Sequence, residues 1–513
     1  MAQPDTLPSD LESAHALIMS LLGRVEDQSS TIDRQAKEIT GRDLLIEKLK
    51  HQLFGERRHR YGSSSEALHQ LQLMLEDLEL ERSADAPAED IQVEPKQKPV
   101  RKPLPEHLPR NDAVLSPPDA CTSCGGKLKQ VSQDVTEELD FIPGRFVVNR
   151  IVRPRMACPC CDTFHQAPLP SRPIERGRPG PGLLAHVLVS KYGDHLPLYR
   201  QSQIYAREGV ELERSTLADW VGKSTALLEP LAEAIGRHVR RGEAIFVDDT
   251  PVDLLAPGTG KTKTARMWIY GRDGRPWGSD APPAAFYQFS KDRRGSHPQT
   301  HLKDYSGYIH ADGYAGFNPL YQKVDVHEVA CMAHIRRKFV DIVKANGSAT
   351  ATEAVQRIAE LYAIEKQIRG KPPDERAQVR QDRAKPLLND LDAWLKSELT
   401  KVSAKSTLGK AIRYALTRIP KVRPYLEHGF LELDNNFAER SIRGIALGRK
   451  NYLFMGSEGG GKAAAIAYTL IETCKLNGIE PQAWLTDTLA RIADHKITRL
   501  DELMPWNYAA DAA

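Results

Sequence analysis

The chain has 513 residues, of which 27% are charged, and a formal net charge of +3. This length exceeds what one compact core usually contains, so we expect several domains. No apolar run approaches the roughly 20 residues that a membrane helix needs, and the first five residues lack the basic and apolar regions of a signal peptide. The composition therefore argues against an integral membrane protein, and we expect a cytoplasmic protein without a membrane partner.

The N-terminal segment carries a seven-residue repeat of apolar side chains. The repeat consists of Leu11, Ile18, Val25, Ile32, Ile39, Ile46 and Leu53, with Ala14, Leu21 and Leu49 at the three-residue offset. Such a seam predicts a coiled coil, placed within residues 11–81, and self-association as a homodimer or higher oligomer. The alternative is an amphipathic helix that packs on its own domain.

Residues 82–110 are rich in Pro, Ala, Glu and Lys and are typical of a linker. Two Cys-x-x-Cys pairs follow, Cys121 with Cys124 and Cys158 with Cys161. This spacing predicts a zinc ribbon at residues 111–170, with a structural Zn²⁺ bound by four thiolates. Cys160 is an alternative ligand, but the Cys-x-x-Cys spacing favours Cys161.

Residues 171–241 contain helix-like segments at 183–192 and 198–207, a turn at Gly209, and a further helix that Ser215 or Thr216 would cap. This order predicts a helix-turn-helix DNA-binding domain, although an ordinary helical hairpin has the same pattern. The candidate contacts to phosphates or bases are basic residues of this segment: Arg200, Arg207, Arg214 and Lys223.

Residues 242–455 begin with short strand-like segments at 244–247, 252–255, 266–270, 285–289 and 308–310. We expect a three-stranded meander, a helix and a further strand, which is the order of a ribonuclease-H-like core. The long interval before Glu439 must carry its own structure, so we predict a helical insertion at about residues 346–425. A C-terminal helical domain should cover residues 456–513. The predicted fold class is thus multidomain α+β.

Three acids occur in unusual settings. Asp248 and Asp312 each end an apolar run of strand length, and Glu439 lies in a helix-like stretch among basic residues. Carboxylate oxygens suit Mg²⁺ or Mn²⁺, and two such ions about 3.5–4 Å apart can activate an attacking oxygen and stabilise the leaving one. Taken alone, each acid is more typical of a turn, a cap or an exposed salt bridge. Because Asp249 follows Asp248 on a strand, only one of the two can readily face the metals, and we choose Asp248.

Two other patterns point to metal or phosphate binding. Residues 456–463 nearly spell a phosphate-binding P-loop, but Ala463 replaces the usual Ser or Thr, so an ATPase is disfavoured. Contact of its amides with DNA phosphates and a plain flexible turn are the open alternatives. Cys331 and His334 are spaced like a metal-ligand pair; only Cys474 remains as another spare thiol, so a buried structural role is favoured.

The sequence around the acids resembles the insertion-sequence-66 family of bacterial DDE transposases along nearly the whole chain. The resemblance is carried by four ordered stretches: 247–251, 312–314, 331–339 and 435–456. It implies that Asp248, Asp312 and Glu439 are the catalytic, metal-binding acids. One departure is Asp249, where the family usually has Glu, and this does not touch the metal-binding Asp248.

We therefore expect a DNA transposase that binds the ends of an insertion element and catalyses metal-dependent phosphodiester cleavage and strand transfer into target DNA. Its partner would be double-stranded DNA, with accessory proteins of the element as further candidates, at the nucleoid of a bacterial cytoplasm. Basic residues near Glu439 would hold the DNA: Arg440, Arg443, Arg449 and Lys450. The alternative is a non-catalytic zinc-ribbon and helix-turn-helix regulator with a decayed nuclease core, which the intact acids disfavour.

Overall fold

The computed structural model describes residues 146–149, 155–157, 164–166, 171–175, 177 and 179–508. Those from 171 onward belong to one compact unit and those up to 166 to a second. The predicted coiled coil, the linker and the four predicted zinc ligands (Cys121, Cys124, Cys158, Cys161) lie outside the described residues, so these remain predictions. No helix in the described ranges is long and apolar enough to cross a membrane.

In the second unit, strands β1 (Arg155–Ala157) and β2 (Phe164–Gln166) pair antiparallel, with Met156 opposite His165. In sequence they flank residues 158–163, which include the second cysteine pair. The described part of this unit therefore comprises residues 146–149 and two short strands on either side of a predicted metal-binding segment.

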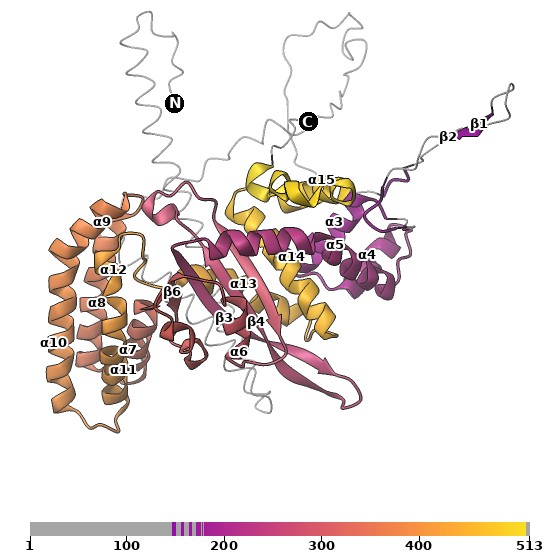
Figure 1. Cartoon of the computed structure of the whole chain (residues 1–513). Coiled ribbons are helices and arrows are strands. Elements are labelled where there is room, and N and C mark those ends of the chain that lie inside the picture. Colours follow the sequence, from indigo (N-terminus) through magenta and orange to yellow (C-terminus); the bar gives the residue numbers. More distant parts are fainter. Residues whose placement is uncertain are drawn as a thin grey trace, which may run out of the picture. The chain divides into compact units, whose positions relative to one another are not determined.

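The larger unit is built on a five-stranded mixed sheet (Figure 1). Its strands are β3 (Ala244–Ala256), β4 (Lys261–Arg272), β5 (Ala284–Ser290), β6 (Gly307–Ala311) and β7 (Val326–Ala330). Their spatial order is β5-β4-β3-β6-β7, in which β3, β4 and β5 form an antiparallel meander while β6 and β7 run parallel to β3. The short helix α6 (Ser296–His301) lies between β5 and β6 in sequence.

The sequence predicted the meander, the helix and β6, but it divided β3 in two and missed β7. The two predicted strands at 244–247 and 252–255 are one continuous strand, because pairing with β4 continues through Asp249, Thr250 and Pro251. Pro251 is tolerated because β6 pairs only with residues 244–246 of β3, which leaves that side of the strand without a ladder. Strand β7 is short and carries His327 and Glu328, so its hydrophobic pattern is weak.

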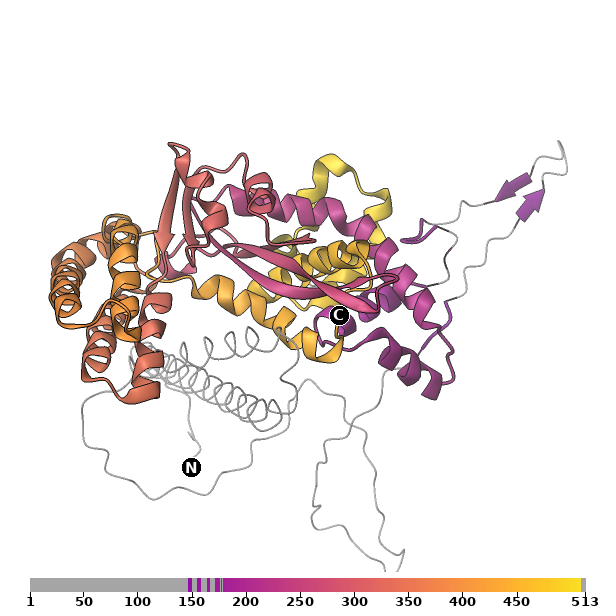
Figure 2. The same ribbon diagram turned by 90° about the horizontal axis from the view of Figure 1, so that it is seen from below.

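Helices cover both faces and one edge of the sheet (Figure 2). On one face, α5 (Arg214–Arg240) packs against β5, where Gly236 lies against the ring of Phe286. On the other, α13 (Asn436–Asn451) places the ring of Phe437 in the space that Gly271 leaves open. Along the β5 edge, Thr469 of α14 (Glu458–Leu476) accepts a hydrogen bond from the backbone N–H of Tyr287 at 2.9 Å. The edge of the sheet is thus capped by a helix.

A helical insertion separates β7 from α13, as predicted. It follows α7 (Met332–Asn346) and consists of α8 (Ala349–Ile368), α9 (Pro373–Val379), a π-turn (Arg380–Ala384), α10 (Lys385–Lys401), α11 (Thr407–Val422) and α12 (Pro424–Glu427). Its apolar faces share one buried cluster with β7 and α7. Two fully buried arginines, Arg376 and Arg380, bind Glu365 inside it.

The region predicted as a helix-turn-helix contains α3 (Pro181–Tyr192), α4 (Leu198–Arg207) and the start of α5. A turn with Gly209 at φ +79° joins α4 to α5, as expected. The predicted caps are wrong, because α5 begins at Arg214 with Glu213 at its N-cap and continues for 27 residues. Its second half buries Leu228, Leu231 and other apolar residues within the same compact unit as the sheet.

The C-terminal region contains α14, α15 (Pro481–Arg491) and short 3₁₀ turns. Shortly before α14, Met455 forms an isolated parallel bridge with Leu254 of β3. The glycine run is not a plain flexible turn, because Gly459, Gly460 and Gly461 lie in the first turn of α14. There the backbone N–H of Gly460 donates to Ser457 Oγ at 3.0 Å, and Gly461 packs tightly against the ring of Phe289. Contact of the amides of this glycine run with DNA phosphates stays a prediction.

Candidate active site

Strands β6 and β7 end at nearly the same level of the sheet, at Ala311 and Ala330, whereas the neighbouring parallel strand β3 continues beyond this level to Ala256. Phe246 of β3 pairs with His310 of β6, their rings stack with centroids 4.7 Å apart, and β6 continues in parallel register with β7. Asp248, Asp312 and Cys331 each follow two residues after these paired positions of β3, β6 and β7. The two-residue period of a strand directs them to the same face as Phe246, which is the face that α13 covers.

Asp248 and Asp312 influence each other electrostatically. Burial raises the pKa of Asp248 well above its usual range, and the carboxylates of Asp312 and Asp249 raise it further. The backbone N–H of Asp249 donates to Asp248 Oδ1 at 2.7 Å and offsets part of this effect on the pKa. Two carboxylates that repel each other fit a divalent cation, because hard cations prefer oxygen ligands and the added positive charge removes the repulsion.

A tight turn orients Asp312. The backbone N–H of Tyr314 donates to Asp312 Oδ1 at 2.9 Å, and the intervening Gly313 has a φ of +85°. A Cβ at this position would lie 2.4 Å from the guanidinium of Arg418. The guanidinium is the end of a flexible side chain and can move, so it is the backbone conformation that favours glycine immediately after Asp312.

Asp249 has different partners from Asp248, as expected for its neighbour on a strand. Arg293 Nη2 lies 2.9 Å from Asp249 Oδ1 and Arg266 Nη1 lies 3.2 Å from Oδ2. Burial raises the pKa of Asp249, and the two arginines oppose this rise. With only 2% of its side chain exposed, Asp249 serves a buried ion-pair cluster on the opposite face of the strand.

The first turn of α13 is fastened to β3 beside Asp248. Asn435, which precedes the helix, donates from Nδ2 to the carbonyl oxygen of Val247 at 3.0 Å, and its backbone N–H donates to Cys331 Sγ at 3.2 Å. The ring of Phe437 packs on that of Phe246, with centroids 5.4 Å apart. Glu439, in this turn, is therefore held on the same face of the sheet as Asp248.

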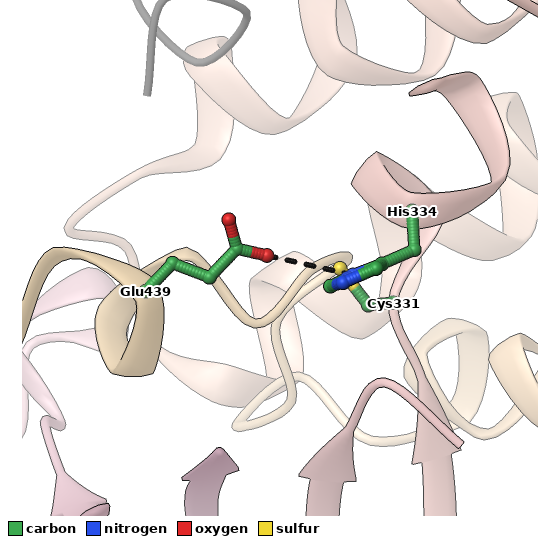
Figure 3. A group of neighbouring side chains, drawn as sticks. All are labelled: Cys331, His334 and Glu439. Atoms are coloured by element: carbon green, nitrogen blue, oxygen red, sulfur yellow. Dashed lines mark ion pairs between the residues drawn. The ribbon is translucent and has the colours of Figure 1, made fainter. Parts of the chain in front are cut away.

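The carboxylate of Glu439 is buried beside residues of α7 (Figure 3). His334 Nδ1 lies 3.4 Å from Glu439 Oε1, and Arg337 Nη2 lies 3.7 Å from Oε2. Among the described residues, Cys331, His334 and Glu439 form the one group whose possible metal-ligand atoms all lie within 4.8 Å of one another. Asp248 and Asp312 are not part of it. Burial, Glu439 and Asp434 raise the pKa of the Cys331 thiol well above its usual range.

Two other glutamates that could be considered for the third acid, Glu432 and Glu458, have partners of their own. Glu432 pairs with the buried Arg376 at 2.5 Å and with Arg369 at 3.8 Å. Glu458 is exposed at the start of α14 and lies 3.9 Å from Lys263. Glu432 therefore belongs to the ion pairs of the helical insertion, and Glu458 to the surface.

The predicted DNA-binding residues fall into two groups in the structure. Those on α4 and α5 are all exposed: Arg200, Arg207, Arg214 and Lys223. Lys223 forms an exposed ion pair with Asp219 at 2.7 Å. On α13, Arg440 and Lys450 are exposed, while Arg443 and Arg449 are half-buried and Arg449 donates to the carbonyl oxygen of Pro251. Arg449 therefore also helps to hold α13 on β3.

Sequence reasoning did not identify Asn435 and Arg337 as neighbours of the acids. Asn435 could have been found as a short polar residue immediately before a helix start. Arg337 carried no such signal, because basic runs are usually solvated, whereas here its side chain is only 2% exposed. His334 was noticed through its spacing from Cys331, but the contact with Glu439 depends on the packing of α7 against α13.

A family model described as "Transposase IS66 family" matches residues 176–463. Three further models match the flanking regions. They are "IS66 C-terminal element" at residues 469–506, "zinc-finger binding domain of transposase IS66" at 118–162, and "Transposase C of IS166 homeodomain" at 44–112. The first covers the sheet, the helical insertion and every acid discussed above. The zinc-finger model supports a structural zinc in the segment that holds the two cysteine pairs.

Similar proteins occur in Sinorhizobium fredii (strain NBRC 101917 / NGR234), where they bear the name of uncharacterized proteins. The protein y4hP is 42% identical over 500 residues, which span 93% of this chain and 90% of that protein. The protein y4jD is 39% identical over a region that spans 80% of this chain and 82% of the length of y4jD. The protein y4qI is 36% identical over a region that spans 99% of this chain and 98% of the length of y4qI. The similarity therefore extends across the domains and is not confined to the acids.

Proposed function

The chain belongs to the transposase IS66 family, and we propose that it cleaves phosphodiesters at the ends of an insertion element and joins the freed ends to target DNA. The observation that carries the proposal is that Asp312 follows the end of β6 at the level of Asp248 on the adjacent parallel strand β3, with α13 fastened to β3 through Asn435. The site is thus assembled from segments far apart in the chain.

The core is proposed to be ribonuclease-H-like. Supporting this are the strand order β5-β4-β3-β6-β7, the antiparallel meander of the first three strands, and the parallel addition of the last two. In that arrangement one acid lies on the first strand, one follows the fourth, and the third is carried by a later helix. Asp248, Asp312 and Glu439 occupy these three places.

Asp248 and Asp312 would hold divalent cations, with Glu439 as the third acidic ligand. Bound Mg²⁺ or Mn²⁺ would polarise the phosphodiester and make water, or a DNA 3′-hydroxyl, a better nucleophile. The chain's own contribution is positioning: the turn at Gly313 orients Asp312, and Asn435 and Phe437 fix the helix that carries Glu439. Exposed basic side chains on α4, α5 and α13 would bind the phosphate backbone.

The experiment is a nicking and joining assay with purified protein and labelled DNA that carries the inverted repeats flanking the gene. Wild-type protein should cleave only when Mg²⁺ or Mn²⁺ is present. Asp248→Asn and Asp312→Asn should each reduce the rate by at least about 100-fold, because a ligand charge is lost while the basic surfaces remain. Asp304→Asn, at an exposed position just before β6, provides the matched control and should cleave like wild type.

The rival function is a DNA-binding regulator without catalysis. It would be supported if wild-type protein bound the end DNA but produced no metal-dependent nick. Cleavage that survives both substitutions would instead place the chemistry at other residues.

A further inference from the structure

Three possible metal ligands from different elements lie close together, namely the side chains of Cys331, His334 and Glu439 (Figure 3). Cys331 follows β7 directly, His334 lies in the first turn of α7, and Glu439 in the first turn of α13. We propose that these three side chains bind a single thiophilic divalent cation such as Zn²⁺. The site is separate from the predicted zinc ribbon, and it does not have the all-oxygen ligands expected for catalytic Mg²⁺.

The ligand chemistry selects the class of cation. Zn²⁺ binds thiolate, imidazole and carboxylate, and sites with three protein ligands and one open position are common for it. Mg²⁺ and Ca²⁺ prefer oxygen ligands only, so a sulfur and a nitrogen disfavour them. The three possible ligand atoms all lie within 4.8 Å of one another, which leaves only a small contraction to close a tetrahedral site around one ion.

The protein holds these ligands in place before any cation binds. Cys331 is the N-cap residue of α7, so the three-residue spacing places His334 on the same side of the helix start. The backbone N–H of Asn435 donates to Cys331 Sγ at 3.2 Å, which ties the start of α7 to the start of α13. The backbone N–H of Met332 also donates to the carbonyl oxygen of Leu433 at 3.1 Å.

Charge and exposure suit a small cation. Cys331 is 3% exposed and Glu439 is 6% exposed, whereas His334 is half-buried and offers a route from solvent. Arg337 approaches Glu439 Oε2, while His334 approaches Oε1. The two oxygens of Glu439 thus have different roles, with Oε1 directed at the proposed ion and Oε2 at the guanidinium.

The site also has a regulatory consequence, which rests on the proposed function. Glu439 would belong both to this site and to the catalytic acids, and one carboxylate held by Zn²⁺ next to His334 is less able to serve a cation at Asp248 and Asp312. Zn²⁺ should therefore inhibit Mg²⁺-dependent cleavage by competing for Glu439.

Binding is tested with Co²⁺ as a spectroscopic probe of the full chain after metal removal. Thiolate-to-cobalt charge transfer and the number of metal ions bound per chain are both measured. The ribbon cysteines are intact in every variant, so their contribution to both measurements is constant. Cys331→Ser and His334→Gln should each bind one cobalt fewer than wild type. Cys474→Ser, which removes the other described buried thiol, is the matched control and should bind as many as wild type.

Equal cobalt binding by wild type, Cys331→Ser and His334→Gln would overturn the proposal. Circular dichroism establishes that each variant is folded. If Cys331→Ser does not fold, His334→Gln decides the outcome, because its side chain is half-buried and its replacement is polar.

Glu439→Gln separates this inference from the proposed function. Loss of the extra cobalt with cleavage intact would support the site and refute the catalytic role of Glu439. Loss of cleavage with the full cobalt complement would support the catalytic role and remove Glu439 from the proposed site. In the cleavage assay, half-inhibition of Cys331→Ser should need at least about tenfold more Zn²⁺ than wild type, and equal sensitivity would overturn the competition.

Discussion

The buried guanidinium of Arg380 offers a quantitative test of how the helical insertion supports the site. Arg380 is fully buried, binds both oxygens of Glu365 at 2.6 and 2.8 Å, and donates to the carbonyl oxygens of Tyr425 and Leu431 at 2.9 Å each. These carbonyls belong to the segment that leads into Asn435 and α13. Replacing Arg380 by Met should therefore loosen the insertion and the approach to Glu439 together.

The magnitude follows from the contacts that are lost. Leaving Glu365 without Arg380 should cost about 3 kcal/mol, the lower end of the range for a broken buried pair, because Arg376 still contacts Glu365. Two buried carbonyls without a donor add about 1 kcal/mol or more each. The free energy of unfolding should fall by about 5 kcal/mol in total.

Urea unfolding followed by tryptophan fluorescence measures this change, and amide exchange of residues 425–433 locates it. Arg383→Met is the matched control, because Arg383 lies in the same π-turn but is exposed, so its replacement should change stability by less than about 0.5 kcal/mol. A loss below about 1 kcal/mol for Arg380→Met would show that the buried ion pairs do not hold this segment.

Three other predictions concern the remaining parts of the chain. Cys124→Ser should remove the ribbon zinc and unfold about residues 110–170, because metal binding supplies much of the folding free energy of so small a domain; a metal assay that finds no tightly bound zinc in wild type would refute the ribbon. Replacing both Ile32 and Ile39 by Lys should abolish self-association while the sheet stays folded. If light scattering shows the variant to be as oligomeric as wild type, the repeat serves internal packing. The pKa of Asp248 is raised in the folded protein, so its carboxyl stays protonated there at pH values where it is ionised in the unfolded chain. Metal-free protein should therefore lose stability as the pH rises from the ordinary Asp range to the raised pKa. Asp248→Asn should remove this loss in melting experiments with a chelator, and an unchanged pH profile would contradict the electrostatic account.

The sequence was most informative where local patterns suffice. Apolar runs ending in acid located β3 and β6, and helical periodicity located the insertion, because both signals depend on residues close together in the chain. The two-residue period of a strand predicted that Asp248 and Asp249 face opposite sides, and their different partners agree with this. The catalytic role of Asp248 rests on the family resemblance and stays a prediction. Strand β7 was missed because His327 and Glu328 weaken its pattern, although parallel pairing with β6 secures it in the fold.

The surroundings of Glu439 could not be predicted in the same way. Its contacts with His334 and Arg337 join two helices that are about a hundred residues apart in sequence, and they arise only when α7 follows β7 and α13 packs on β3. Likewise, the glycine run at 456–461 resembles a phosphate loop locally. Only the packing of Gly461 on Phe289 of β5 shows why a residue without a side chain is needed at position 461.

The central claim is that Glu439 completes the acidic site, and it is tested most directly by single-turnover cleavage of end DNA by Glu439→Gln. DNA binding is measured in parallel, and Glu458→Gln, an exposed glutamate at the start of the next helix, is the matched control. We predict that Glu439→Gln binds DNA like wild type but cleaves at least about 100-fold more slowly, while Glu458→Gln cleaves normally. Cleavage by Glu439→Gln within about tenfold of the wild-type rate would contradict the account and place the third acid elsewhere.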